Sequence, residues 1–295
     1  MFIDGIVLID KPAGCTSHDV VNRWRRLANT KRVGHLGTLD PMATGLLVLI
    51  SGRATRLAQF YGKEQKTYIA EVTLGLVSDT YDADGSVETT GVPPPENPGA
   101  INEALNEFRG AFMQKPPPFS AKKIKGVPAY KLARANLPVD LEPVEMTISE
   151  LTMKVLAPDR IELTVTSSAG TYIRSLAHDL GQRLGCGAIL SNLRRTNVGQ
   201  YQVAGARTLD EVGTLADAGR LAEALIPISL MLPQFPAQHF DTSVEGTIRQ
   251  GRDFRTSPFV IVPGAPVVRA LSRSGDLIAI GELRMPNVYH PATVV

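Results

Sequence analysis

Apolar and polar residues alternate along part of this chain in the pattern that is typical of β-strands. In residues 67–74 every second residue is apolar, which predicts a strand with Tyr68 on its more apolar face. Other segments are short and apolar enough to form strands with at least one buried face. These segments are residues 6–9, 46–50, 144–156 and 160–167.

Helical spacing of apolar residues is equally clear elsewhere. Thr16 and Asp19 resemble a capping box, and apolar residues follow at every third or fourth position, so a helix is predicted over about residues 17–28. The stretch from Ile173 to Leu184 is amphipathic and predicts a second helix. Shorter helices are expected at residues 54–61 and 101–108.

Glycines and prolines indicate where these elements end. Residues 29–45 contain Gly34, Gly37, Pro41 and Gly45 and are predicted to form a loop. Residues 110–125 contain three consecutive prolines and several lysines, which predicts a long irregular segment. Loops of this length are usually functional or disordered.

The last fifth of the chain is predicted to form a separate small domain. Residues 227–238 contain three prolines and are predicted to be a linker. Beyond them, strands are expected at 259–262, 266–271 and 277–283. The sequence therefore predicts a large domain at 1–232 and a small all-β domain at 237–295. A chain that ends near Gln234 is expected to fold without the small domain.

Composition adds little until the charges are located. The chain has 295 residues, of which 43% are hydrophobic and 20% charged, so disordered and fibrous classes are excluded. The net charge is only +2. However, basic residues cluster in segments without acids, which would create a local positive field if these segments converge. The segments are residues 20–39, 115–134 and 180–209.

Several classes of protein lack support in this sequence. The two cysteines and five histidines have no metal-ligand spacing, so we expect neither a structural metal nor a disulfide framework. The N-terminus lacks the features of a signal peptide. The longest apolar run, residues 46–50, is far shorter than the ~20 residues that cross a bilayer. A cytoplasmic protein with no membrane association is therefore expected.

Residues 34–45 hold the strongest candidate for chemistry. Asp40 precedes Pro41, which restricts its backbone to extended conformations and thereby restricts the direction of its carboxylate. The surrounding glycines would let a large ligand approach the backbone. Judged from composition alone, an Asp-Pro pair with nearby glycines is more often an ordinary turn.

The segment resembles the catalytic motif G-H-T-G-T-L-D-P-x-A-T-G of the TruB family, the tRNA pseudouridine-55 synthases. Leu36 replaces the usual threonine, so no hydroxyl role is expected there. Further segments are similar to the remaining motifs of that family and occur in the same order. They are Asp10–Ser17, Lys66–Tyr68, Asp79–Gly85, Gln114–Ala121 with Gly126 and Tyr130, Gly170–Leu176, and Leu193–Thr196.

The resemblance implies that one uridine is isomerised to pseudouridine. That reaction breaks the C1′–N1 bond and rejoins the base through C5, without redox chemistry, so no cofactor is expected. Asp40 would be the nucleophile. Attack at C1′, elimination to a glycal and addition at C6 all remain open.

The resemblance also implies a set of residues around the substrate. Tyr68 would stack on the uracil, Arg174 would pair with Asp40 and keep it ionised, and Leu193 would pack against the base. His35 would fill the gap left by a flipped nucleotide. The remaining members of the substrate-binding set are Tyr172, Lys11 and Asp82, of which the last two would support the active-site loop. From the residues alone, each could instead be an ordinary core or surface residue.

The implied fold is an α+β core with a mixed, largely antiparallel sheet flanked by helices, followed by a PUA-like RNA-binding domain. An insertion at about 110–135 would grip the TΨC stem-loop of tRNA, and the enzyme would act as a monomer without a protein partner. The alternatives are a non-catalytic tRNA-binding module and a guide-RNA-dependent enzyme of ribosomal RNA. Asp40, Tyr68 and Arg174 argue against the first, and the insertion argues against the second. An unrelated metal hydrolase would lack ligands.

Overall fold

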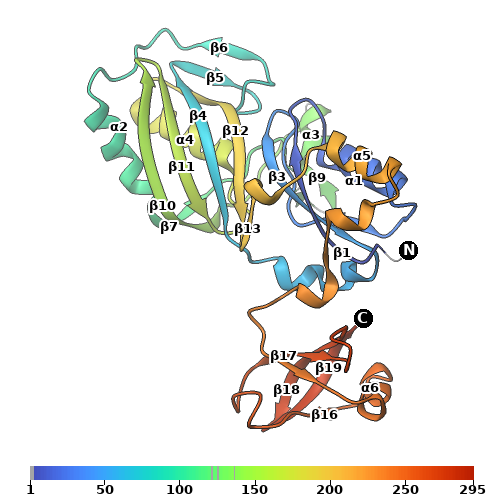
Figure 1. The fold of residues 1–295 in the computed structure, drawn as a ribbon. Coiled ribbons are helices and arrows are strands. Elements are labelled where there is room, and N and C mark those ends of the chain that lie inside the picture. Colours follow the sequence, from blue (N-terminus) through green and yellow to red (C-terminus); the bar gives the residue numbers. More distant parts are fainter. Residues whose placement is uncertain (1–2, 121, 125, 136) are drawn as a thin grey trace.

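The computed structural model describes residues 3–120, 122–124, 126–135 and 137–295. A large sheet with helices precedes a smaller C-terminal sheet (Figure 1). The ten-stranded sheet has the order β14-β1-β3-β12-β4-β11-β10-β7, with β2 added to β3 and β13 added to β12. Its strands are β1 (Gly5–Lys11), β2 (Val33–His35), β3 (Thr44–Ser51), β4 (Lys66–Leu74), β7 (Gly110–Gln114), β10 (Val144–Ala157), β11 (Arg160–Ser167), β12 (Ala188–Val198), β13 (Tyr201–Gln202) and β14 (Leu225–Pro227).

All pairings in this sheet are antiparallel except that of β12 with β3, where Arg194 lies opposite Thr44. The expected mixed, largely antiparallel sheet is therefore confirmed. The helices of the described chain are α1 (Ser17–Leu27), η1 (Gly52–Tyr61), α2 (Pro98–Leu105), η2 (Asn106–Phe108), α3 (Ala129–Arg134), α4 (Ile173–Leu184), η3 (Val203–Gly205), α5 (Leu209–Asp217), η4 (Leu221–Ala224), η5 (Ile228–Leu230) and α6 (Thr242–Arg249).

Burial explains why apolar and polar residues alternate in some strands and not in others. On β4, Tyr68 and every second residue after it are buried in one core cluster, which also contains residues of α4. On β3, successive residues belong to different clusters on the two faces of the sheet. A strand covered on both faces needs apolar residues throughout, which is why β3 has a continuous apolar run.

The predicted helices agree with the structure in place and in capping. Thr16 caps α1, and the reciprocal hydrogen bonds with Asp19 form the expected capping box. The predicted helix at 54–61 is a 3₁₀ helix, η1, and starts two residues earlier.

Three expectations about loops and strands were wrong. The predicted loop at 29–45 contains the strand β2, which pairs with β3. The predicted irregular segment begins with β7, an edge strand that pairs with β10. Residues 259–262 form no strand. In addition, no strand was expected at residues 188–198, where β12 joins the two halves of the sheet.

The C-terminal part holds a five-stranded sheet in the order β15-β17-β18-β19-β16, together with α6. Its strands are β15 (Ala237–His239), β16 (Phe254–Arg255), β17 (Val267–Leu271), β18 (Leu277–Met285) and β19 (Val288–Val294). The strands predicted at 266–271 and 277–283 correspond to β17 and β18. Two strand pairs complete the strands of the described chain: β5 (Leu76–Ser78) with β6 (Val87–Thr89), and β8 (Lys123–Ile124) with β9 (Val127–Pro128). Two isolated bridges, Ile9 with Arg207 and Asp82 with Leu190, lie outside these strand pairs.

The segment predicted to be a linker is packed for half of its length. Met231 and Leu232 are fully buried and share a core cluster with η1 and with Ile280 of β18. Gln59 also donates a hydrogen bond of 2.9 Å to Thr293 Oγ1 across the same junction. The boundary between residues 232 and 237 stays a prediction, but the two sheets share apolar surface.

This junction has a measurable consequence for a chain that ends at Gln234. Removal of Ile280 and its neighbours would expose Leu57, Tyr61 and Met231 to water. We therefore expect the truncated protein to unfold at a temperature several degrees below that of the full chain, because each large apolar side chain exposed costs roughly 1.5–3 kcal/mol. Calorimetry of both chains measures this. An unchanged melting temperature would show that the cluster contributes nothing to the stability of the large domain.

Within the described residues, no helix is both long enough and apolar enough to cross a membrane.

Candidate active site

The loop that carries Asp40 connects β2 to β3 and is fastened from several sides. Ser17 of α1 accepts a hydrogen bond from the Leu39 N–H at 2.8 Å and donates one to the Leu39 carbonyl at 2.9 Å. Lys11, at the end of β1, donates to the Pro41 carbonyl at 3.2 Å. The residues on both sides of Asp40 are thus held by buried groups, so the carboxylate has a defined position.

Arg195 of β12 holds the other half of the same loop. Its guanidinium donates to the carbonyls of Gly37 at 3.0 Å, Thr38 at 3.3 Å and Leu46 at 2.7 Å. The side chain is almost fully buried. Arg195 belongs to the Leu193–Thr196 motif, but the sequence assigns it no role, because backbone carbonyls leave no signal in a sequence.

Lys11 does not line the cavity described below. Its ammonium is fully buried and also donates to the carbonyls of Pro12 and Cys15, both at 2.8 Å. Burial lowers the pKa of this lysine. Lys11 is therefore placed as a support of the loop, not as a group that touches a ligand.

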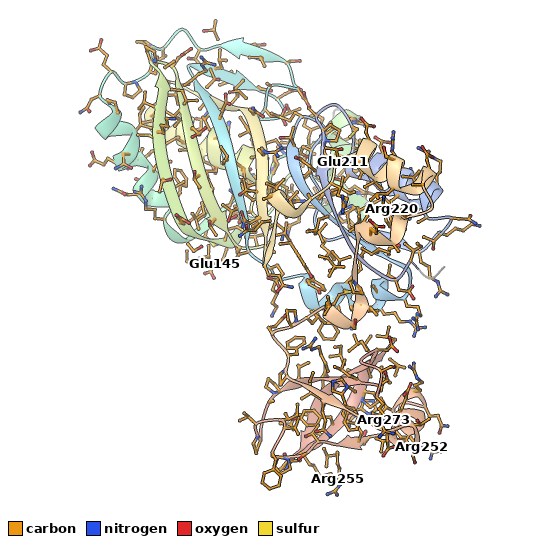
Figure 2. The ribbon with its side chains drawn as sticks, viewed as in Figure 1. Glu145, Glu211, Arg220, Arg252, Arg255 and Arg273 are labelled. Carbon is orange, nitrogen blue, oxygen red and sulfur yellow. The ribbon has the colours of Figure 1, made fainter. Side chains whose placement is uncertain are left out.

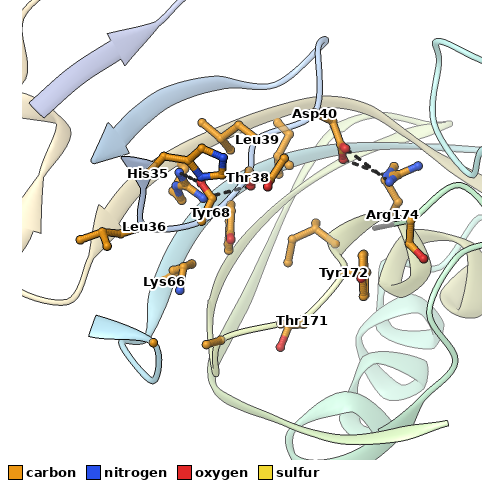
Figure 3. A pocket seen from close by; sticks show the side chains of 18 of the residues that line it. His35, Leu36, Thr38, Leu39, Asp40, Lys66, Tyr68, Thr171, Tyr172 and Arg174 are labelled. Carbon is orange, nitrogen blue, oxygen red and sulfur yellow. Dashed lines mark hydrogen bonds and ion pairs between the residues drawn. The ribbon is translucent and has the colours of Figure 1, made fainter. Parts of the chain in front are cut away.

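Arg174, in the first turn of α4, forms the expected pair with Asp40 (Figure 3). Its Nε lies 2.9 Å from Asp40 Oδ2, and its Nη2 lies 3.4 Å from Oδ1. The same guanidinium donates to the carbonyls of Thr80 and Phe119, both at 3.0 Å. Such a two-point contact fixes the orientation of the carboxylate.

Asp82 lies on the far side of Arg174, with Oδ2 3.4 Å from Nη1. Its side chain is 5% exposed, whereas that of Asp40 is 36% exposed. Burial raises the pKa of Asp82, while Thr80 and Arg174 oppose that rise. Of the two carboxylates that share Arg174, only Asp40 can meet a ligand, and Asp82 supports the arginine from behind.

A cavity of about 500 Å³ opens beside Asp40. Its size is within the range usual for small-ligand sites. Six of the residues singled out in the sequence come together in its walls, from five different segments of the chain. They are His35, Asp40, Tyr68, Tyr172, Arg174 and Leu193.

The insertion at about 110–135 reaches this cavity from one side. Phe119 and Ser120 line it. At the base of the insertion the buried amide of Gln114 donates to the Tyr172 carbonyl at 3.0 Å and accepts from the Tyr172 N–H at 2.9 Å. The insertion is therefore connected to the segment that precedes Arg174, a link that the sequence analysis did not foresee.

Besides Arg174, the basic residues His35, Lys66 and Arg195 line the cavity. Burial, together with the charge of Arg195, lowers the pKa of His35, so its ring is neutral near pH 7. Its Nδ1 is buried and has no hydrogen-bond partner among the described residues. Burial and Arg195 also lower the pKa of Lys66 to about 8.

The three basic segments are less separate from acids than the sequence indicated. Arg23 pairs with Asp210, Lys115 with Asp140, Arg183 with Glu107, and Arg194 with Asp10. Distance along the chain does not keep charges apart in the fold. Lys122 and Lys123 are exposed and carry none of the ion pairs between described residues, and Lys125 lies outside the described residues.

Within the described chain, no group of three or more His, Cys, Asp or Glu side chains is arranged to hold a metal ion.

The chain is similar in sequence to known proteins along its whole length. A model described as "TruB family pseudouridylate synthase (N terminal domain)" matches residues 25–173, and one described as "tRNA pseudouridylate synthase B C-terminal domain" matches residues 174–232. The tRNA pseudouridine synthase B of Solibacter usitatus is 48% identical over 293 residues, which are 99% of this chain and 100% of that relative. The protein of the same name from Aquifex aeolicus is 41% identical and covers 85% of this chain and 86% of its own length.

Solved structures share the fold. A chain in a crystal structure of a Cbf5-Nop10-Gar1 complex is 25% identical, with a TM-score of 0.70, and the match covers 100% of this chain and 85% of that one. A chain of an H/ACA RNP bound to a substrate RNA containing 2′-deoxyuridine has a TM-score of 0.71 at 23% identity, with the same coverage. The predicted pseudouridine-synthase fold is therefore confirmed.

Proposed function

Because this chain belongs to the TruB family of pseudouridylate synthases, we propose that it converts uridine 55 in the TΨC arm of tRNA to pseudouridine. The observation that carries this proposal is the carboxylate of Asp40, partly exposed at the cavity and held at two points by Arg174. A relative named tRNA pseudouridine synthase B matches 99% of this chain.

We assign the nucleophile of this reaction to Asp40. The C1′–N1 bond breaks, the uracil turns, and a C1′–C5 bond forms, while the hydrogen at C5 leaves as a proton and N1 gains one. A carboxylate beside C1′ can trap the oxocarbenium-like centre, and a carboxylate beside C6 can add to the ring. Arg174 holds Asp40 at two points, which orients the carboxylate for either route.

The reacting uridine has to leave the RNA stack to reach Asp40, because chemistry on a base inside a stem-loop requires extrusion. Tyr68 and Leu193 line the cavity from adjacent strands, β4 and β12, and are suited to contact a flat base. Tyr172 lines it from the segment before α4. His35 is neutral and has an unpaired ring nitrogen, which suits a position against RNA bases.

The insertion and the C-terminal part would contact the RNA outside the cavity. Exposed arginines lie on the C-terminal part, as Figure 2 shows for Arg252, Arg255 and Arg273. We propose that the chain acts alone, as a monomer, since its own insertion supplies a wall of the site.

The position of the reaction is tested with two purified transcripts of one tRNA, identical except for cytidine at position 55. The wild-type protein, without added RNA or protein, should place pseudouridine at position 55 of the first and at no position of the second, as read by mass spectrometry of nuclease fragments. Modification elsewhere, or a requirement for a guide RNA, would overturn this assignment.

The exposed lysines of the insertion give a prediction about affinity. A Lys122→Ala/Lys123→Ala protein should bind tRNA about three- to ten-fold more weakly, and the slope of log affinity against log salt should flatten by up to about 1.5, because fewer counterions are released. Lys154→Ala on the exposed face of β10 is the matched control. An unchanged slope would show that these two lysines do not meet phosphate.

A further inference from the structure

Lys66 is a buried cation that the proposed reaction does not use. It is the first residue of β4, its side chain lines the cavity, and it is 7% exposed. In Figure 3 it lies at the end of the cavity away from the pair of Asp40 and Arg174. Its position raises the question of which anionic group binds to its ammonium.

The hydrogen bonds of Lys66 within the described chain do not neutralise it. Nζ donates to the Glu64 carbonyl at 2.9 Å, which uses one of its three donors. Lys66 takes part in none of the ion pairs between the described residues. The charges that act on it are the repelling guanidinium of Arg195 and the more weakly attracting carboxylate of Glu64.

The loop of Asp40 leaves space for this lysine at Gly37. A Cβ at that position would lie 3.1 Å from Lys66 Cε and 3.4 Å from Arg195 Nη1. The two cations therefore approach the loop at the same point. Arg195 is occupied by the carbonyls of Gly37, Thr38 and Leu46, whereas Lys66 has donors left for a ligand.

A buried charge without an anionic partner destabilises a fold, because desolvation is not offset. An anion that arrives with the ligand would offset it. We propose that Lys66 forms a cationic subsite that binds a phosphate of the RNA backbone next to the target uridine. This inference rests on the proposed function and adds a specific contact to it.

The charge distribution of the cavity favours binding of the phosphate at the end where Lys66 lies. Asp40 would repel a phosphate at its own end, where the sugar and the base must react. Lys66 attracts one at the opposite end. The two charges together would set the direction in which the nucleotide enters, so that the ribose faces Asp40.

The test uses TΨC stem-loop RNAs in which one phosphate at a time is a neutral methylphosphonate. Each methylphosphonate follows a 2′-O-methyl ribose for chemical stability, and the matched RNA with a 2′-O-methyl ribose and an ordinary phosphate is the control. Binding is measured with Asp40→Asn protein, which prevents turnover, with and without the additional change Lys66→Met. Turnover of the unsubstituted RNA by wild type is measured first.

One methylphosphonate beside the target uridine should weaken binding about ten-fold when Lys66 is present and less than two-fold when it is Met, because a charged hydrogen bond is worth about this much. Lys66→Met should also melt no lower than wild type, since a buried charge is removed. Lys66→Gln should behave in the same way and serves if the Met variant does not fold.

Equal losses with both proteins at every position, or a lowered melting temperature of both variants, would overturn the inference and make Lys66 a structural residue. Absence of turnover by wild type would overturn the proposed function and this inference together. If wild type turns over, but no methylphosphonate weakens binding more in the presence of Lys66 than in the Lys66→Met protein, the inference alone would be overturned.

Discussion

Replacement of Asp40 by asparagine is expected to lower turnover by at least about 1,000-fold while the affinity for tRNA stays within about three-fold of wild type. The amide keeps the shape of the carboxylate and can still accept a hydrogen bond from Arg174, which lies 2.9 Å away. It cannot act as a nucleophile, so the interaction lost belongs to the transition state and appears in kcat.

Single-turnover assays with the protein in excess and filter binding measure these two quantities separately. Asp84→Asn is the matched control, because Asp84 is exposed and does not line the cavity, so its turnover should be normal. A rate of even one hundredth of wild type in the Asp40→Asn protein would remove Asp40 from its role, once mass spectrometry has excluded deamidation to aspartate.

Replacement of Arg174 by lysine is the second change expected to be severe, with a loss in kcat of about 100-fold or more. The guanidinium holds Asp40 through two nitrogens and at the same time donates to the carbonyls of Thr80 and Phe119. A lysine ammonium keeps the charge but has a single nitrogen, so it cannot reproduce the planar arrangement. Asp82 would also lose its ion-pair partner on the buried side.

Arg183→Lys on the same helix is the matched control, since Arg183 is exposed and pairs with Glu107 at the surface. Circular dichroism and calorimetry show whether the Arg174→Lys protein is folded. If it is folded and turns over at a near-normal rate, the geometry of the guanidinium is not what holds Asp40 for reaction.

The parts of the fold that the sequence predicted are those with local signals. The apolar periodicity of β4 and α4 and the capping box of α1 depend on residues close together in the chain. The strand β12 was missed because Arg194 and Arg195 interrupt its apolar pattern, yet Arg195 is buried by bonding to carbonyls. The pairing of β7 with β10 joins residues 30 to 38 positions apart, which no local pattern reveals.

The candidate site also divides into residues that local motifs reveal and residues whose roles depend on distant parts of the chain. Six of the side chains that line the cavity were identified by their motifs, and the structure brings them together. Lys11 and Asp82 belong to a layer behind them, where they hold a loop carbonyl and Arg174. Gln114 and Arg195 act on backbone atoms that are 58 and 158 positions away, such as the Tyr172 and Gly37 carbonyls. Such partners become visible only when the chain is folded.

The central claim is that this chain alone, through Asp40, isomerises one uridine of tRNA. It is tested most directly by tritium release from an unmodified tRNA transcript labelled at C5 of its uridines, with purified protein in buffer that contains EDTA and no cofactor. The account predicts release of one tritium per tRNA by the wild-type protein and none by the Asp40→Asn protein. No release by the wild type, or equal release by both proteins, would contradict it.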